Sequence, residues 1–188
     1  PLASNGSIMS LGDVRGRLKA IRERGGRMIL IDPRRTETAS ICDEHHPIVP
    51  GGDAALLLAM LQVIFEEGLE DKAALGAMAE GEAALRAAAK TTPPERVADA
   101  IGVDAATIRR LAREFAGAKR AVAYSRVGVS VSEFGSVASW LVEALNVATG
   151  NFDRPGGSMF ATPAVDLGSL ARKVGVSRAG RYRSRVRG

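Results

Sequence analysis

A short apolar run that stops at an aspartate and a proline constrains this fold more than any other feature of the sequence. Residues 28–31 read Met-Ile-Leu-Ile, and Asp32 and Pro33 follow. A continuous apolar run of this length, rich in β-branched residues, is typical of a strand buried on both faces of a parallel sheet. Pro33 has no amide hydrogen and disfavours helix at Asp32, so the strand is predicted to end there.

Helical patterns alternate with strand-like segments along the chain. Apolar residues at spacings of three and four predict helices, which cover residues 11–21, 54–67, 70–90, 94–101, 105–115 and 137–149. Two further short strands are predicted at residues 48–49 and 121–124. Alternation of this kind predicts an α/β fold: an open, mostly parallel, Rossmann-like sheet flanked by helices.

The carboxyl-terminal part of the sequence has a different character. Residues 161–188 show no steady period and are predicted to be irregular, which divides the chain into an α/β domain at 1–165 and a basic tail at 166–188. The last 18 residues hold seven of the 26 Lys and Arg and no acid, which leaves 19 basic against 21 acidic residues before them. This charge distribution argues against a nucleic-acid face on the folded domain. The tail itself is either a solvated segment or a contact for an anionic partner.

Composition excludes several classes of protein and site. No apolar run is long enough for a membrane-spanning helix. The single cysteine, Cys42, excludes an intrachain disulfide and a cysteine cluster for zinc or iron–sulfur, and it is interpreted as a small buried residue. His45 and His46 are neighbours on an extended segment and point to opposite faces, so they do not chelate one metal ion. No catalytic set of side chains emerges from the spacing.

Loops that follow the strands are the expected ligand site, because open α/β sheets bind ligands at the carboxyl ends of their strands. Asp32 is placed to accept hydrogen bonds from a ribose, and Arg34, Arg35 and Thr36 follow within reach of a phosphate. The alternative is an aspartate that caps the next helical turn, with two arginines facing solvent. A third loop, residues 125–133, is expected at the same edge.

Two more polar turns precede helices. In the turn at residues 50–53, Gly51 and Gly52 allow a close backbone approach, and Asp53 either accepts two hydrogen bonds from a guanine edge or caps its helix. Residues 4–7, Ser-Asn-Gly-Ser, either cradle an anion through backbone amides or form an ordinary N-cap turn.

Three stretches in this order resemble the molybdopterin oxidoreductases of the dimethyl-sulfoxide-reductase type, and formate dehydrogenases in particular. They are residues 27–39 (RMILIDPRRTETA), 46–56 (HPIVPGGDAAL) and 145–157 (LNVATGNFDRPGG). Asn5-Gly6-Ser7 also resembles the end of the family's glycine–alanine–asparagine–proline loop.

The resemblance implies that this chain is a middle domain of a longer catalytic subunit. Such a domain would hold the guanosine end of a bis(molybdopterin guanine dinucleotide) molybdenum cofactor. Ser4, Asn5, Gly6 and Ser7 would lie near the pyrophosphate; Asp32, Pro33, Arg34, Arg35 and Thr36 would contact ribose and phosphates; Gly51, Gly52 and Asp53 would meet the guanine; Gly128 would approach the pterin.

The remaining machinery would lie elsewhere in the subunit. The resemblance implies that an iron–sulfur cluster, the protein ligand of molybdenum and the substrate contacts belong to the missing part, so the fragment alone is expected to be inactive. The partners implied are the other domains of the same subunit and a small-molecule substrate, and no nucleic acid. The reaction implied is a two-electron reaction such as formate oxidation. The expected location is the cytoplasm, without a membrane span. Two alternatives stay open: the central domain of a thiamine-diphosphate enzyme, and a non-enzymatic anion-binding module that uses the basic tail.

Overall fold

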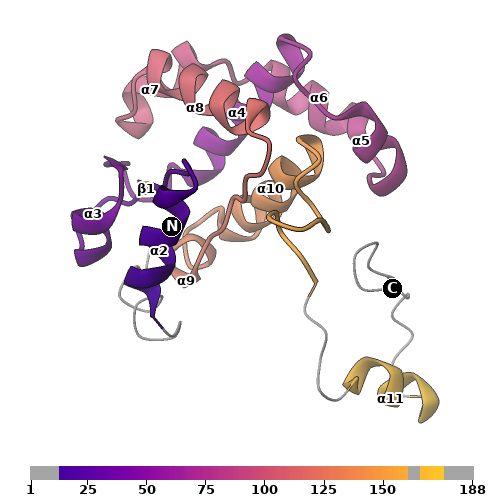
Figure 1. Ribbon diagram of the computed structural model, residues 1–188. Helices are drawn as coiled ribbons and strands as arrows, with labels where there is room; N and C mark the ends of the chain where they lie inside the picture. Colours follow the sequence, from indigo (N-terminus) through magenta and orange to yellow (C-terminus); the bar gives the residue numbers. More distant parts are fainter. Residues whose placement is uncertain (1–12, 161–165, 176–188) are drawn as a thin grey trace.

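One helix, α4 (Asp53–Glu66), forms the centre of the molecule. The computed structural model describes residues 13–160 and 166–175 (Figure 1). Apolar side chains occupy most positions of α4, and those buried in the core lie on several sides of the helix: Leu56, Ala59, Met60, Leu61, Val63 and Ile64. A helix that is apolar all round must be covered on all sides, so α4 organises the packing of the other helices.

Four helices pack against α4. They are α6 (Glu82–Lys90), α7 (Pro94–Ile101), α8 (Ala105–Gly117) and α10 (Gly135–Ala148). A shorter helix, α5 (Lys72–Met78), packs against α10. The predicted cap at Asp104 is confirmed, because its carboxylate accepts a hydrogen bond from the Thr107 amide at 2.8 Å. The region 70–90, predicted as helical throughout, is two helices separated by Gly81 at φ 78°.

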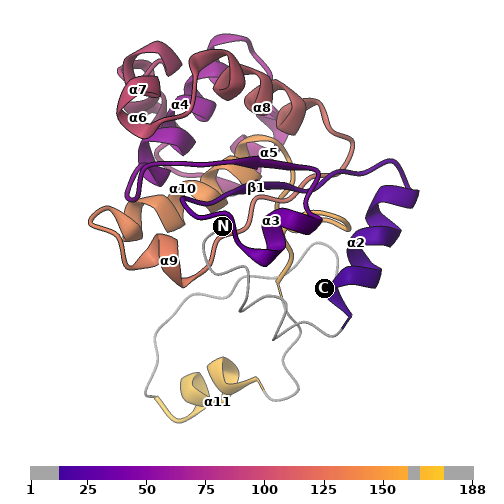
Figure 2. The ribbon, with the colours of Figure 1, turned by 90° about the vertical axis from the view of Figure 1, so that its left-hand side faces the viewer.

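Two parallel strands form the sheet of the described residues. Strand β1 (Ile29–Ile31) pairs with β2 (Glu44–His46), with Leu30 opposite His45. The strands are joined through α3 (Glu37–Ile41), and α2 (Val14–Glu23) precedes β1. Figure 2 shows the strands running beneath the layer of α4, α7 and α8, with α2 and α3 on the other side. The strand predicted at residues 28–31 is confirmed at 29–31, but only Leu30 is buried, whereas Ile29 and Ile31 are half-buried.

The open, Rossmann-like sheet is not found: within the described residues the fold is helix-rich with a two-stranded parallel sheet. The strand predicted at residues 48–49 is wrong. Ile48 is buried in the helical core, and the Val49 amide donates to the Ile101 carbonyl at the end of α7. Pro47 and Pro50 flank this pair and lack the amide hydrogens that a ladder needs, so the strand forms earlier, at β2.

The strand predicted at residues 121–124 is also wrong, because asparagine side chains take its hydrogen bonds. The Ala123 amide donates to Asn146 Oδ1 at 2.8 Å, and Asn146 Nδ2 donates back to the Ala123 carbonyl at 2.9 Å. The Ala121 amide donates to Asn151 Oδ1 at 3.2 Å. Both asparagines are buried. Their amides supply the donors and acceptors that a neighbouring strand would otherwise provide.

The tail is not wholly irregular. Residues 167–173 form α11 (Leu167–Lys173), and Asp166 accepts a hydrogen bond from the Ser169 amide at 2.8 Å. The other predicted helices are confirmed to within a few residues at their ends.

The domain boundary at residue 165 lies outside the described residues and stays a prediction. No helix in the described ranges is long and apolar enough to cross a membrane.

Candidate functional site

The turn after β1 holds a buried carboxylate with one unused oxygen. Asp32 is only 1% exposed, and its Oδ1 accepts a hydrogen bond from the Arg34 amide at 2.8 Å. His45 Nε2 donates to the Asp32 carbonyl at 2.9 Å, which anchors the turn to β2. Asp32 Oδ2 is buried and has no hydrogen-bond partner in the described part of the chain. An orphaned buried oxygen costs about 1–3 kcal/mol, and such groups are rare without a reason.

Asp53, the first residue of α4, holds a second such carboxylate. The N-cap of α4 is Gly52 and Asp53 is the first helical residue, so the prediction that Asp53 is the N-cap is wrong; its carboxylate interacts with its own backbone amide. The residue is 7% exposed, and among the described residues nothing bonds to its buried Oδ2. Burial raises the pKa of the Asp53 carboxyl above its ordinary value, and the negative charge of Asp32 raises this pKa further.

The Asp32 amide donates to the His46 carbonyl at 3.3 Å, so the turn after β1 lies beside the end of β2, seven residues before Asp53. The two carboxylates therefore follow neighbouring parallel strands of the sheet. They come from chain segments about twenty residues apart, at the carboxyl end of β1 and the amino end of α4. Each keeps one buried oxygen without a partner within residues 13–160 and 166–175. A ligand that offers N–H or O–H donors to both would remove the unfavourable burial of both groups.

Arg34 and Arg35 are exposed cations beside the first carboxylate. Neither guanidinium makes a hydrogen bond or ion pair inside the described ranges. By contrast, Arg110 on α8 reaches Glu44 at 2.7 Å, and Arg113 reaches Glu67 at 2.7 Å. Planar guanidiniums with free donors are suited to phosphate oxygens. Pro33 and Thr36 are half-buried in the same turn, and Thr36 is the N-cap of α3.

The two glycines before α4 serve the turn in different ways. Gly51 has a φ of 88°, a conformation that favours glycine, and the space where a Cβ would lie is open. A Cβ on Gly52 would lie 3.0 Å from both the Ile101 Cβ and the Val49 carbonyl oxygen. Close packing against α7 therefore accounts for glycine at position 52, whereas the open side of the turn lies at Gly51.

The remaining predicted site residues do not belong to these two turns. Gly128 is half-buried in α9 (Val127–Ser130), which packs against α10. Ser4, Asn5, Gly6 and Ser7 lie outside the described residues. The site therefore consists of the turn at 32–36 and the turn at 51–53.

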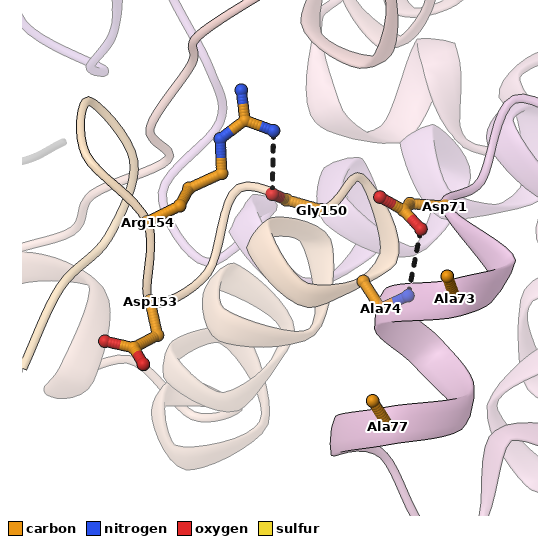
Figure 3. Close-up of a pocket in the computed structure, with 7 residues that line it drawn as sticks. All are labelled: Asp71, Ala73, Ala74, Ala77, Gly150, Asp153 and Arg154. Carbon is orange, nitrogen blue, oxygen red and sulfur yellow. Dashed lines mark hydrogen bonds between the residues drawn. The ribbon is translucent and has the colours of Figure 1, made fainter. Parts of the chain in front are cut away.

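A separate pocket of about 620 Å³ lies where α5 meets the loop after α10 (Figure 3). Its polar groups already serve the fold. Asp71 accepts a hydrogen bond from the Ala74 amide at 2.9 Å and caps α5, and Arg154 donates to the Gly150 carbonyl at 3.1 Å. The 145–157 stretch singled out in the sequence thus has a structural role here, and sequence reasoning missed its buried Asn146 and Asn151.

Cys42 shows no sign of a reactive or metal-binding role. The thiol is half-buried rather than fully buried, and burial together with the negative charge of Asp43 raises its pKa to about 11. It is therefore protonated at neutral pH. Across residues 13–160 and 166–175, no group of three His, Cys, Asp or Glu residues is placed to hold a metal ion.

Replacing Asp53 with asparagine is expected to stabilise the cofactor-free 188-residue chain at pH 7. An acid whose pKa is higher in the folded than in the unfolded chain lowers stability once the pH exceeds both values. Removing the charge should raise the free energy of unfolding by about 1 kcal/mol. The gain should shrink as the pH falls through the raised pKa, because the native carboxyl is then protonated. Urea unfolding at pH 7 and pH 4 measures both values.

Asp99→Asn is the matched control, because Asp99 is exposed on α7. It should change stability by less than about 0.5 kcal/mol at either pH. An Asp53→Asn variant that is less stable than the native chain at pH 7 would contradict the burial of an uncompensated charge.

Comparison with known proteins assigns the chain to a class. The model of the molybdopterin oxidoreductase family matches residues 8–181, and the chain belongs to this family. This confirms the resemblance noted in the sequence and favours it over the central domain of a thiamine-diphosphate enzyme.

Individual relatives agree with this assignment. The chain is 38% identical to formate dehydrogenase H of Escherichia coli, over 71% of this chain and 19% of that protein. It is 36% identical to the molybdopterin-containing subunit of thiosulfate reductase of Salmonella typhimurium, over 74% of this chain and 19% of that protein. The solved structure of acetylene hydratase from Pelobacter acetylenicus matches with a TM-score of 0.70 and 33% identity, covering 75% of this chain and 19% of that chain. The chain thus spans about a fifth of the length of these relatives.

Proposed function

We propose that this chain is a domain of a molybdenum-dependent oxidoreductase that holds the guanosine end of a bis(molybdopterin guanine dinucleotide) cofactor. The observation that carries the proposal is the pair of buried carboxylates, Asp32 and Asp53, each with an oxygen that has no partner in the described part of the chain. Family membership supports a molybdopterin cofactor. The two turns supply the acceptors for its nucleotide.

Guanine is the base that suits Asp53. Its N1–H and exocyclic N2–H₂ lie side by side, and one ionised carboxylate accepts both hydrogen bonds. Adenine and cytosine offer no such adjacent pair of donors. Hydrogen bonds from guanine would give Asp53 Oδ2 the partner it lacks among the described residues and would favour the ionised form of the carboxyl.

The neighbouring turn suits the ribose and phosphates. Asp32 lies at the carboxyl end of β1, where an acidic residue accepts hydrogen bonds from ribose hydroxyls in many nucleotide-binding sheets. Arg34 and Arg35 would pair with phosphate oxygens, with Pro33 and Thr36 shaping the turn. Gly51 would let the nucleotide approach the backbone, beside Gly52.

Two further contacts follow from the family resemblance alone. Ser4, Asn5, Gly6 and Ser7 would lie near the pyrophosphate, and Gly128 near the pterin.

The bound cofactor would supply two-electron chemistry at molybdenum, while this chain binds and orients its nucleotide. Formate oxidation is one reaction that fits, given the similarity to formate dehydrogenase H, and the similar thiosulfate reductase subunit represents another. The substrate contacts, the metal ligand and an iron–sulfur cluster would belong to other domains of a longer catalytic subunit. The relatives' greater length supports such a subunit.

Molybdenum and nucleotide content of the full polypeptide test the proposal. Acid hydrolysis of the purified protein should release GMP together with molybdenum. The double variant Arg34→Gln/Arg35→Gln should retain about a third of the GMP, because two exposed charge–phosphate contacts contribute little individually. Arg113→Gln, which alters an exposed, ion-paired arginine on α8, is the matched control and should retain the native content.

Two outcomes would count against the proposal. A native protein that releases CMP or no nucleotide would refute guanosine binding. A double variant equal to the Arg113→Gln control would refute the phosphate contacts of Arg34 and Arg35.

A further inference from the structure

A strip of large apolar side chains is exposed along α9 and the first half of α10. We call it the apolar strip; its members are Val127, Val131, Phe134, Val137 and Trp140, each 50–75% exposed. All five fall within 14 consecutive residues, which include one charged residue, Glu133. Large contiguous apolar patches on a protein surface usually mark interaction sites, whereas single exposed apolar residues are ordinary.

Helix α10 has one buried apolar side and an exposed edge with two large apolar side chains. Ala138, Leu141 and Leu145 are buried on the side of α4. Val137 and Trp140 lie one helical turn apart beside this buried side and are exposed, as are the polar Ser136 and Glu143. The exposed apolar side chains of α10 therefore form one edge of the helix, next to α4.

A groove beside Trp140 extends this surface. It has a volume of about 450 Å³ and lies between α4, α6 and α10. Small side chains, including Ala54, Ala84 and Ala88, line it together with Leu58, Val137 and Trp140. An apolar groove bordered by small residues accepts the side chains of a helix or loop from a partner.

Side chains on α8 show what a solvent-facing surface of this chain looks like. Arg109 pairs with Glu95 at 3.0 Å, Arg110 with Glu44 at 2.7 Å and Arg113 with Glu67 at 2.7 Å. This surface satisfies its charges within the chain and needs no partner. The apolar strip differs from this surface in having five large apolar side chains and one charged residue within 14 positions, although other large apolar residues, such as Val122 and Leu167, are also exposed.

We propose that the apolar strip and its groove are the docking surface for another domain of the same polypeptide, which inserts an apolar helix or loop. The length of the relatives argues for this occupant, because four fifths of formate dehydrogenase H and of acetylene hydratase lie outside the region matched by this chain. The near absence of charge in residues 127–140 argues for an apolar partner segment. The inference rests on the proposal that the chain is one domain of a longer subunit, and it is independent of guanine recognition.

Photo-crosslinking of the full polypeptide tests the proposed docking surface. p-Benzoylphenylalanine is placed at position 140 in one sample, at position 131 in a second, and at position 113 on α8 as the matched control. After irradiation, positions 131 and 140 should each cross-link within one polypeptide to a peptide outside residues 1–188, at least tenfold more than position 113. Mass spectrometry of the digested protein identifies the partner peptide.

Three results would overturn the docking surface. Cross-links that double the mass would assign it to a second copy of the polypeptide. Cross-links only to peptides within residues 1–188, or yields at 131 and 140 equal to the control, would show that no other domain covers the strip. The GMP and molybdenum content of the native protein is measured separately, so failure of the docking surface is distinguishable from failure of guanosine binding.

Discussion

Replacing Asp53 with alanine in the full polypeptide is expected to lower its GMP and molybdenum content at least tenfold. The Asp53 carboxylate is buried, and its Oδ2 has no partner in the described residues, so the guanine edge would give this oxygen the hydrogen bond that it lacks and would donate a second one to the same carboxylate. Losing hydrogen bonds to a charged group costs about 1.5–3 kcal/mol, which corresponds to roughly 10- to 100-fold in affinity. Metal analysis and chromatography of the released nucleotide measure the effect.

Asp99→Ala provides the control for this prediction. Asp99 is exposed on α7, the helix that packs against α4, so its removal takes away the same charge outside the candidate site. The control should keep its full cofactor content. An Asp53→Ala protein that folds and retains as much GMP as Asp99→Ala would show that guanine does not contact Asp53.

The second large effect is expected from Asn146→Ala, which should lower the free energy of unfolding of the 188-residue chain by about 3 kcal/mol. Asn146 is fully buried on α10 and exchanges two hydrogen bonds with the backbone of Ala123. Alanine leaves the N–H and C=O of the half-buried Ala123 without these partners and opens a small cavity at the buried position 146. Urea denaturation followed by circular dichroism measures the change.

An exposed neighbour on the same helix separates this effect from the change in helix propensity that alanine brings. Ser136→Ala on α10 removes only an exposed hydroxyl and should change stability by less than about 0.5 kcal/mol. A loss below about 1 kcal/mol for Asn146→Ala would contradict the role of this side chain in holding the segment at residues 121–124.

Sequence signals that act over a few neighbouring residues were enough to predict most of the secondary structure. The helices around α4 have clear apolar periodicity, and Asp104 lies where a cap is required. The strand at 28–31 combines β-branched residues with a proline stop. These signals act within a few residues of each other, so they can be interpreted without the tertiary structure.

The predicted strands that failed depend on contacts far apart in the sequence. Residues 121–124 have a strand-like composition, but Asn146 and Asn151, more than twenty residues later, take their backbone hydrogen bonds. At residues 48–49 the partner is the end of α7, fifty residues away. Short apolar pairs do not reveal which partner the fold will supply.

The candidate site was predictable in part. Open α/β sheets bind ligands at the carboxyl ends of their strands, and this predicted Asp32 as a site residue. The glycine-containing turn at residues 50–53 predicted Asp53. Only the structure shows that β1 pairs with β2, the strand that leads into α4, so that the two carboxylates follow neighbouring strands. The sequence also favoured a cap at Asp53, and the buried oxygen without a partner in the described residues became evident only from the structure.

Density for the cofactor in a structure of the loaded, full-length protein tests the central claim most directly. The account predicts guanine N1 and N2 within about 3 Å of the Asp53 carboxylate oxygens, with the attached ribose at Asp32. A guanosine bound elsewhere, with both carboxylates facing solvent or protein alone, would contradict it.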